Sequence, residues 1–470
     1  MSNKLNNDKY YEQIRNTLNL NNVFLIGNGF DLALGKLSSY KDFLLYLFLF
    51  QVYYNIGEDT KKFVQILDYI SKKNPISYDK VVSVVKQKLN SAKDYGFSDF
   101  IGIDSSFLAL FFMVLSQRIA LDEETQNKIF YFFSIHYCPL AFLFDDLFIL
   151  ANLNNKFLSD SELENIYNFI DRFYCSLTPA HDDYSLSLEG WFDVESFIEY
   201  IVLKDAFLEK QFTLNNNLGQ NIKKIIENKK IAQNCTNASY LLESLQQFTN
   251  YFCEFLYLQD GLSNEITNRM LTNVFSNYAI SINGKNFDLS FTDFIKTVSY
   301  VIDFNYTPTS NNIFANNLDK ISNSDFEIYH VNGCYWTEEN KLFNNAIFGY
   351  TKTNACKVNK YAYKFEKRAQ RQIKNIKGPD YKKITEKEFN LFIYGHSCST
   401  ADKDVLYQLL TSPNLKFVIV FCYTENDKLS IFKNLSEIIG NDNMDFLTRQ
   451  TTELKHRLIW AENTKATEQK

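Results

Sequence analysis

The sequence predicts an α/β fold in which a mostly parallel sheet carries a large all-helical insertion after its first strand and helix. Nearly continuous runs of Val, Ile, Phe and Tyr stand close to the start of the chain and again beyond residue 295. Such runs are typical of parallel strands covered on both faces. Between Ser38 and about Lys285, apolar residues recur instead at every third and fourth position, which is the spacing of amphipathic helices.

The length and composition agree with this division. The chain has 470 residues, of which 46% are hydrophobic and 16% aromatic, but only 15 glycines and 6 prolines. Both of these counts lie below the usual frequencies of about 7% and 5%, which favours long helices over a turn-rich β-sandwich. We predict a discontinuous α/β domain at residues 20–45 and 286–460, a helical insertion domain at 46–285 and a frayed tail at 461–470.

Five apolar segments are predicted to be strands of the sheet, and several deliver polar residues at their carboxyl ends. They are VFLIGNG (23–29), VSYVIDFNYT (298–307), FEIYHVNG (326–333), LFIYGHS (391–397) and KFVIVFCY (416–423). Because open α/β sheets bind ligands at the carboxyl ends of their strands, we expect the functional site there.

Bulk properties exclude several classes of protein. The first twenty residues are polar and lack the apolar core of a secretory signal. No apolar run reaches the roughly 18 residues of a membrane span, so a cytoplasmic protein without a membrane partner is expected. The eight cysteines lie at least eighteen positions apart, so no zinc or redox motif exists and no metal is predicted.

The charge distribution argues against nucleic acid as a partner, because the net charge is −6 and phosphate backbones favour basic proteins. One segment, residues 352–388, is basic, with twelve Lys and Arg against four Asp and Glu. It predicts a solvated helix face; the alternative is an anion-attracting surface near a ligand mouth.

The first strand ends in a glycine turn, GNGFD, before a helical stretch that begins near Asp31. Glycine at positions 27 and 29 permits positive φ and lets a ligand phosphate approach the backbone, which makes the unit Rossmann-like and nucleotide-binding. Leu32 stands where the dinucleotide fingerprint would have its third glycine. The alternative is a tight turn in which Asp31 caps the helix.

Seven segments form an ordered set along the chain: GNGFDLALGKLSSYKDFL (27–44), WFDVESF (191–197), DFNYTPT (303–309), YHVNG (329–333), IFGYT (347–351), FEKRAQRQI (365–373) and IYGHSCSTAD (393–402). Together they resemble the bacterial family of bacteriophage abortive infection proteins called AbiH. This resemblance implies antiviral defence in which the infected cell is sacrificed or arrested, with a phage-derived trigger protein as a partner.

The same motif order is similar to that of SIR2-like NAD-binding domains. This similarity implies catalytic roles for Asn305 and His330, and it implies binding roles for the glycine turn Gly27, Asn28 and Gly29 and for the late loop Gly395, His396 and Ser397. The sequence departs from the pattern where Asn28 replaces an alanine, Asn332 replaces a second histidine and Pro308 follows the Asn-Tyr-Thr. These departures bear on catalysis more than on the fold.

The implied ligand is NAD or a related nucleotide, and NAD(+) glycohydrolase (NADase) activity is a hypothesis. Cleaving the nicotinamide–ribose bond builds positive, oxocarbenium-like charge on the sugar. An amide such as Asn305 can orient a water or a ribose hydroxyl, and an imidazole such as His330 can take a proton. Asp31 and Asp402 are candidates to hold ribose hydroxyls, and the backbone amides around Asn28 are candidates to hold pyrophosphate.

Other interpretations stay open. IYGHSCS is similar to the nucleophile elbow of α/β-hydrolases, with Ser397 as nucleophile and His456 downstream, but Ser399 occupies the place of the second glycine. A non-catalytic sensor of nucleotides or phage components fits the missing second histidine. A defence nuclease could use the basic stretch, although no two-metal cluster of acidic residues stands on the strands.

Two further patterns are weak. His181, Asp182 and Asp183 could bind a metal, and Trp191 with Glu195 reads as helix packing rather than as a site. The sequence leaves open the trigger, the role of the insertion and assembly into a homo-oligomer.

Overall fold

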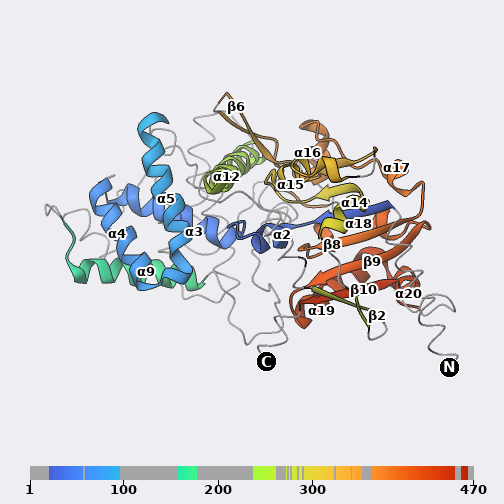
Figure 1. The fold of residues 1–470 in the computed structure, drawn as a ribbon. Coiled ribbons are helices and arrows are strands. Elements are labelled where there is room, and N and C mark those ends of the chain that lie inside the picture. Colours follow the sequence, from blue (N-terminus) through green and yellow to red (C-terminus); the bar gives the residue numbers. More distant parts are fainter. Residues whose placement is uncertain are drawn as a thin grey trace, which may run out of the picture. The chain divides into compact units, whose positions relative to one another are not determined.

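The computed structural model describes residues 21–56, 59–95, 157–176, 237–260, 271, 275, 278–282, 285–287, 291–321, 324–339, 341–351, 362–449 and 457–463 (Figure 1). The chain divides into two compact units. Unit 1 takes in Met1–Lys36, Ser263–Thr353 and Glu366–Lys470, and unit 2 takes in Leu37–Leu262 and Asn354–Phe365.

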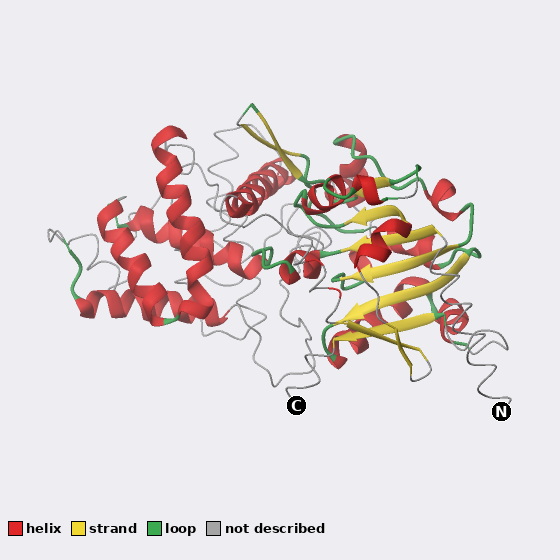
Figure 2. Ribbon diagram, viewed as in Figure 1, coloured by secondary structure: helices red, strands yellow, loops and turns green. Residues whose placement is uncertain are grey.

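Unit 1 contains an eight-stranded sheet in the order β3-β2-β10-β9-β8-β1-β4-β5. The six strands from β10 to β5 pair in parallel throughout, whereas β2 and β3 are antiparallel (Figure 2). The strands are β1 (Asn21–Ile26), β2 (Tyr278–Ile282), β3 (Lys285–Phe287), β4 (Val298–Asp303), β5 (Glu327–His330), β8 (Phe389–Tyr394), β9 (Leu415–Cys422) and β10 (Leu458–Asn463). This arrangement confirms the α/β, Rossmann-like fold and all five predicted strands.

Helices cover both faces of this sheet. One core cluster packs the sheet against α17 (Tyr381–Thr385), α18 (Lys403–Leu410), α19 (Glu425–Ile439) and α20 (Asn441–Thr448). The other packs it against α2 (Asn28–Ala33), α14 (Phe291–Thr297) and α15 (Thr309–Ala315). Shorter elements complete the unit: η4 (Leu318–Lys320), the hairpin β6 (Tyr335–Glu338) and β7 (Lys341–Asn344), α16 (Lys367–Ile373) and η7 (Thr400–Asp402).

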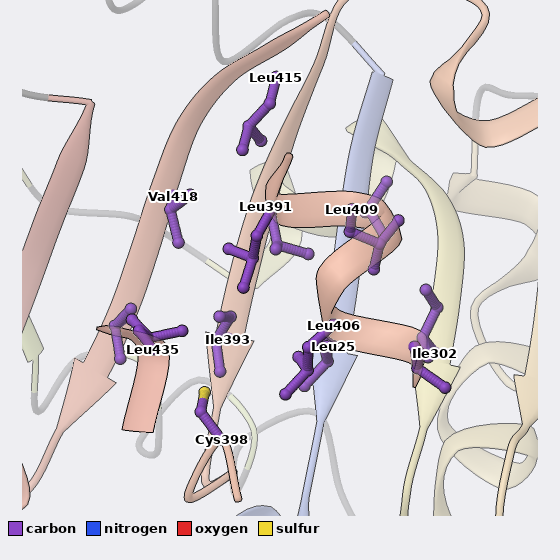
Figure 3. Close-up of a cluster of buried hydrophobic side chains, with 14 of the residues drawn as sticks. Leu25, Ile302, Leu391, Ile393, Cys398, Leu406, Leu409, Leu415, Val418 and Leu435 are labelled. Carbon is purple, nitrogen blue, oxygen red and sulfur yellow. The ribbon is translucent and has the colours of Figure 1, made fainter. Parts of the chain in front are cut away.

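Successive residues of a buried strand feed the two clusters alternately. In β1, Val23 and Leu25 belong to the first cluster, and Phe24 and Ile26 belong to the second. Figure 3 shows Leu25 beside residues of the neighbouring strands and of α18 in the first cluster. Two buried faces explain why these strands are continuous apolar runs instead of alternating patterns.

Unit 2 contains helices, as the three- and four-residue spacing predicts. They are α3 (Tyr40–Asn55), α4 (Thr60–Lys73), α5 (Pro75–Tyr95), α9 (Asp160–Ser176), α12 (Asn237–Asp260) and the short η6 (Ala362–Phe365). Every residue from Phe43 to Phe50 is buried, and α3 contacts α4, α5, α9 and α12. A helix that is apolar all round must lie inside its unit, and α3 does. Two apolar stretches with this spacing, FLALFFMVL (107–115) and SFIEYIVL (196–203), lie outside the described residues.

The structure differs from the sequence prediction at the borders of the α/β domain. β2 lies inside the range 46–285, for which only helices are predicted, and β10 takes up residues 461–463 of the predicted tail. Unit 2 begins at Leu37 instead of residue 46. Short strands near a sheet edge carry too few apolar residues to give a clear period, so such borders are hard to read.

Phe24→Ala is expected to lower the free energy of unfolding by about 3–5 kcal/mol, because it leaves a cavity in the second cluster. The Phe24 ring is wholly buried and contacts the rings of Phe30, Phe275 and Phe294. Urea titration measures the loss. Phe432→Ala on the exposed face of α19 is the matched control and is expected to cost about 1 kcal/mol or less. Equal losses in the two variants would contradict the packing described.

Candidate functional site

The topology of the sheet marks one place for a ligand. Among the parallel strands, β1 is followed along the chain by β4 and β5 on one side, and then by β8, β9 and β10 on the other side. The order of the strands therefore reverses between β1 and β8. Open α/β sheets bind ligands outside the carboxyl ends of their strands at such a reversal.

At this reversal the turn after β1 packs directly on the turn after β8. The N–H of Gly27 donates to the carbonyl of Tyr394 at 3.0 Å, and the N–H of Gly29 donates to the carbonyl of Gly395 at 2.8 Å. A Cβ on Gly27 or Gly29 would lie 2.7 Å from main-chain atoms of Gly395. These two glycines are therefore required by the approach of another strand end.

Positive φ belongs to Gly395 in this contact, at 63°, and not to Gly27, whose φ is −126°. A Cβ on Gly395 would also lie 2.3 Å from the Phe30 nitrogen. Because the N–H of Phe30 donates to the Gly27 carbonyl, three amides of the predicted pyrophosphate cradle already have protein acceptors.

Asn305 and His330 come together at the ends of the neighbouring strands β4 and β5. Asn305 is 3% exposed, and neither its side-chain oxygen nor its nitrogen has a hydrogen-bond partner among the described residues. Both ring nitrogens of His330 are buried in the same way, without a hydrogen bond. Burial lowers the pKa of His330 to about 4, so its imidazole is neutral at pH 7.

Asn332 adds a fifth unsatisfied atom to the four of Asn305 and His330. Its Nδ2 donates to the Phe304 carbonyl at 3.2 Å, while its buried Oδ1 has no partner in the described part of the chain. Folded proteins leave few buried polar atoms unpaired, since each costs about 1–3 kcal/mol. Five such atoms at the ends of β4 and β5 are the strongest structural sign of a ligand site.

Two buried carboxyl groups lie on the α2 and α15 side of these strand ends. Asp31 accepts a hydrogen bond from the Thr307 hydroxyl at 2.6 Å. Asp303 accepts from the main-chain N–H of Asn305 and from the hydroxyl of Ser310. Both side chains are fully buried. Asp31 therefore contacts the segment that follows β4 and does not cap α2 by a side-chain hydrogen bond.

In the loop after β8, the side chains of His396 and Asp402 are hydrogen-bonded to protein groups. The Cys398 N–H donates to Nδ1 of His396 at 2.9 Å, so Nε2 carries the proton that faces Asp402 at 3.2 Å. Lys367, which is fully buried, donates to the other oxygen of Asp402 at 2.7 Å. Burial alone would raise the pKa of Asp402, but the Lys367 ammonium and His396 hold it below its ordinary value.

This network packs against the residue that precedes Asn305. The His396 ring packs against the Phe304 ring at a centroid distance of 4.2 Å, and Phe304 precedes Asn305. His396 and Asp402, which were predicted to contact a nucleotide, thus have protein partners at their polar side-chain atoms. Ser397 is exposed, and its carbonyl accepts from Asn434 at 2.9 Å.

The geometry around Ser397 departs from a nucleophile elbow. The positive φ values in this loop belong to Gly395 and Cys398, and α18 begins only at Lys403. A nucleophile elbow places its serine on the strained turn itself, directly before the helix. His456 lies outside the described residues, as do the segments 181–183 and 191–197.

The basic stretch 352–388 is described from residue 362 onward, and most of its cations there contact protein acceptors. The contacts join Lys367 to Asp402, Arg371 to Asp404, Lys374 to the Ala346 carbonyl, and Lys377 and Lys383 to Glu327. Within the described ranges, no group of three or more His, Cys, Asp and Glu is placed to hold a metal ion. A membrane-crossing helix is likewise absent from the described segments.

Asp303 and Lys367 are the residues of this region that sequence reasoning missed. Asp303 stands in the DFNYT segment, and its signal is a carboxyl as the last residue of an otherwise apolar strand. Lys367 stood in a basic stretch read as solvated, and its partner lies 35 positions away. Nothing in the sequence alone indicates that Lys367 and Asp402 form a pair.

Comparison with known proteins adds the following. A family model described as bacteriophage abortive infection AbiH matches residues 23–423. This range begins in β1 and ends just after β9, so it includes every residue of the candidate site. No curated protein and no solved structure gave a match.

Removing one partner of the buried pair Lys367–Asp402 is expected to lower the free energy of unfolding by about 3–5 kcal/mol, because the other charge stays buried alone. The substitutions are Lys367→Met and Asp402→Leu. The double variant is expected to cost much less than their sum, since both charges leave together. Urea titrations of the four proteins at pH 7 measure this coupling; additive losses would show that the two side chains do not depend on each other.

In His330→Gln, the free energy of unfolding is expected to fall less steeply than in the wild type as the pH is lowered. The ordinary pKa of histidine is about 6.5, and burial lowers that of His330 to about 4. Between these values the unfolded chain binds a proton that the folded protein does not, so stability falls as the pH is lowered. Between pH 7 and 4.5 the wild type should lose about 2.5 kcal/mol more than His330→Gln. Parallel stability curves for the two proteins would contradict a buried, neutral His330.

Proposed function

Since this chain belongs to the bacteriophage abortive infection AbiH family, and so acts in defence against phage, we propose that unit 1 binds NAD or a related nucleotide and hydrolyses it when phage is sensed. The ligand lies at the carboxyl ends of β4 and β5, against Asn305, His330 and Asn332. The SIR2-like motif order of the sequence supports the choice of NAD.

The observation that carries this proposal is the set of five buried polar atoms that make no hydrogen bond within the described part of the chain. Amide oxygen and nitrogen on Asn305, both ring nitrogens of His330 and Oδ1 of Asn332 can donate and accept hydrogen bonds. A ribose has hydroxyl groups that do both. A purely apolar ligand would leave all five atoms unsatisfied, so the ligand class is polar.

The chemistry of these groups suits N-glycosidic cleavage. The bond to nicotinamide breaks through an oxocarbenium-like state that needs no strong acid, because the leaving group departs neutral. A neutral imidazole at pH 7 can accept the proton of the attacking water. The Asn305 amide can hold that water or the ribose while the charge on the sugar develops.

The polar groups of the β8 loop already have protein partners, which makes them poor candidates for contacts with the ligand. Asp402 has the Lys367 ammonium and the His396 N–H on its two oxygens. Using it to bind ribose would expose or break a buried ion pair. We therefore assign recognition to the β4 and β5 ends and a supporting role to His396 and Asp402.

The burial of the unpaired atoms also suits a regulated enzyme. A ligand cannot reach atoms that solvent cannot reach unless part of the protein moves first. Ligand switches commonly work by such local rearrangements. A resting protein that leaves NAD intact until phage arrives agrees with a closed site.

The test is to express wild type, Asn305→Ala and His330→Ala in bacteria, challenge them with phage and measure cellular NAD together with survival of the culture. Wild-type cells should lose NAD after infection, and each variant should slow this loss by about 100-fold or more. Asn426→Ala is the matched control, because it is the same substitution at an exposed position of α19.

Unchanged NAD in protected wild-type cells would overturn NAD hydrolysis. If the two variants then still lost protection, the non-catalytic sensor would be favoured, because the site would matter without turnover. Asn332, which stands in place of a second histidine, is the feature that favours that second candidate.

A further inference from the structure

Asp303 is the last residue of β4 and lies in register with Ile26 of β1 and His330 of β5. The same row continues through Tyr394 and Phe421 on the other side of β1. Parallel register partners share one face of a sheet. In this row the side chains are apolar until β4, where a carboxyl and an imidazole stand next to each other.

The two oxygens of this carboxyl reach both residues of the proposed active site. Oδ1 accepts from the main-chain N–H of Asn305 at 2.8 Å, and Oδ2 lies 3.4 Å from Nδ1 of His330. Oδ2 also accepts from the Ser310 hydroxyl at 2.5 Å. One side chain thus connects the main chain that carries the amide to the ring that carries the base.

The 3.4 Å separation is slightly longer than a good hydrogen bond. Hydrogen bonds in active sites are often loose before a ligand binds and tighten in the complex. A movement of a few tenths of an ångström by the ring would form this one. Within the described ranges, no other carboxyl is placed to form an ion pair with His330.

The charged and titratable groups around Asp303 come from every element near it. Asp31 of α2 and Lys36, which follows α2, interact with its charge, as does Cys334 after β5, and His330 is its neighbour on β5. Burial raises the pKa of Asp303 well above its ordinary value, and Asp31 adds to this, while Ser310 and the Asn305 amide oppose it. Burial lowers the pKa of His330. Both directions favour uncharged side chains.

We propose that Asp303 is the positioning residue of this site: its carboxyl fixes the main chain at Asn305 and sets which ring nitrogen of His330 carries the proton. The role of Asp303 in catalysis rests on the proposed function, but its contacts with Asn305 and His330 do not.

The proton count follows from the contacts. A proton held on Oδ2 of Asp303 would be offered to Nδ1 of His330, which lies 3.4 Å away. A neutral imidazole that accepts at Nδ1 carries its own proton on Nε2. In the resting protein, Nε2–H therefore faces the ligand as a donor. For His330 to take a proton from water, the ring must turn so that its unprotonated nitrogen, Nδ1, faces the water and receives that proton.

The test uses the purified full-length chain with ¹⁵N in its histidine rings. The chain has only five histidines, and His330→Gln identifies the signals of His330. At pH 7 the wild type should show the neutral Nε2–H form. In Asp303→Ala the two nitrogens should move toward the average of both neutral forms. Asp303→Asn keeps an acceptor for Asn305 and a donor for Nδ1, so it should restore the wild-type pattern.

Asp303→Ala should also reduce phage protection by about 100-fold, which is the typical cost of misplacing reacting groups by about 1 Å. Asp303→Asn should recover part of that loss. Glu327→Gln, which changes a carboxyl at the other end of β5, is the matched control and should leave the His330 signals unaltered.

Unchanged His330 signals in an Asp303→Ala protein that melts like the wild type would overturn the proposal. If Asp303→Ala does not fold, the comparison of Asp303→Asn with the wild type decides alone. A His330 ring that carries its proton on Nδ1 in the wild type, and loses it there in Asp303→Asn, would show that the Asp303 carboxyl acts in its ionised form. Cellular NAD that stays constant while the His330 signals depend on Asp303 would refute NAD hydrolysis and leave the positioning role standing.

Discussion

The contact between the turn after β1 and the turn after β8 is the constraint on which the rest of unit 1 depends. The hydrogen bond from Gly29 to Gly395 leaves no room for a side chain on either strand end. The contact sets where the loop from Gly395 to Asp402 runs, and this loop carries the His396 ring that supports Phe304. Phe304 in turn precedes Asn305. Gly27 and Gly29, whose pattern is typical of a phosphate-binding turn, thus serve first to let two strand ends pack closely. They influence the site through the contact between the rings of His396 and Phe304.

The two halves of the site differ in how their polar groups are satisfied. Around β8, the groups of His396, Asp402 and Lys367 complete one another inside the protein. Around β4 and β5, the side chains of Asn305 and His330 have no hydrogen-bond partners within the described part of the chain. Each unpaired atom costs about 1–3 kcal/mol, and a folded chain keeps such a cost where function requires it. We assign ligand binding to the β4 and β5 ends because the unsatisfied atoms of Asn305 and His330 lie there, whereas the side chains of His396, Asp402 and Lys367 are hydrogen-bonded to one another.

Much of the sheet could be predicted from the sequence, because strands buried on both faces leave continuous apolar runs with polar residues at their ends. The placement of Asn305 and His330 at neighbouring strand ends could be predicted for the same reason, since parallel strands bring their carboxyl ends together; their catalytic roles stay a prediction. The glycine contact could not, because Gly29 and Gly395 are separated by the whole helical unit. Asp402 was predicted to bind ligand, and the structure instead gives it Lys367 as a partner. Asp303 was overlooked because a carboxyl at the end of a strand has no meaning until the neighbouring strand is known.

The central claim is that the ends of β4 and β5 bind a nucleotide. Isothermal titration calorimetry with NAD and with ADP-ribose tests it most directly, since ADP-ribose contains the ribose and pyrophosphate but no bond to cleave. We expect saturable binding of ADP-ribose to the wild type, weakened by the free energy needed to open the buried site, and a further loss of about 2 kcal/mol or more in binding free energy when Asn305 and His330 are both replaced by Ala. Equal affinity in the wild type and the double variant, with both proteins folded, would contradict the placement of the ligand at these strand ends.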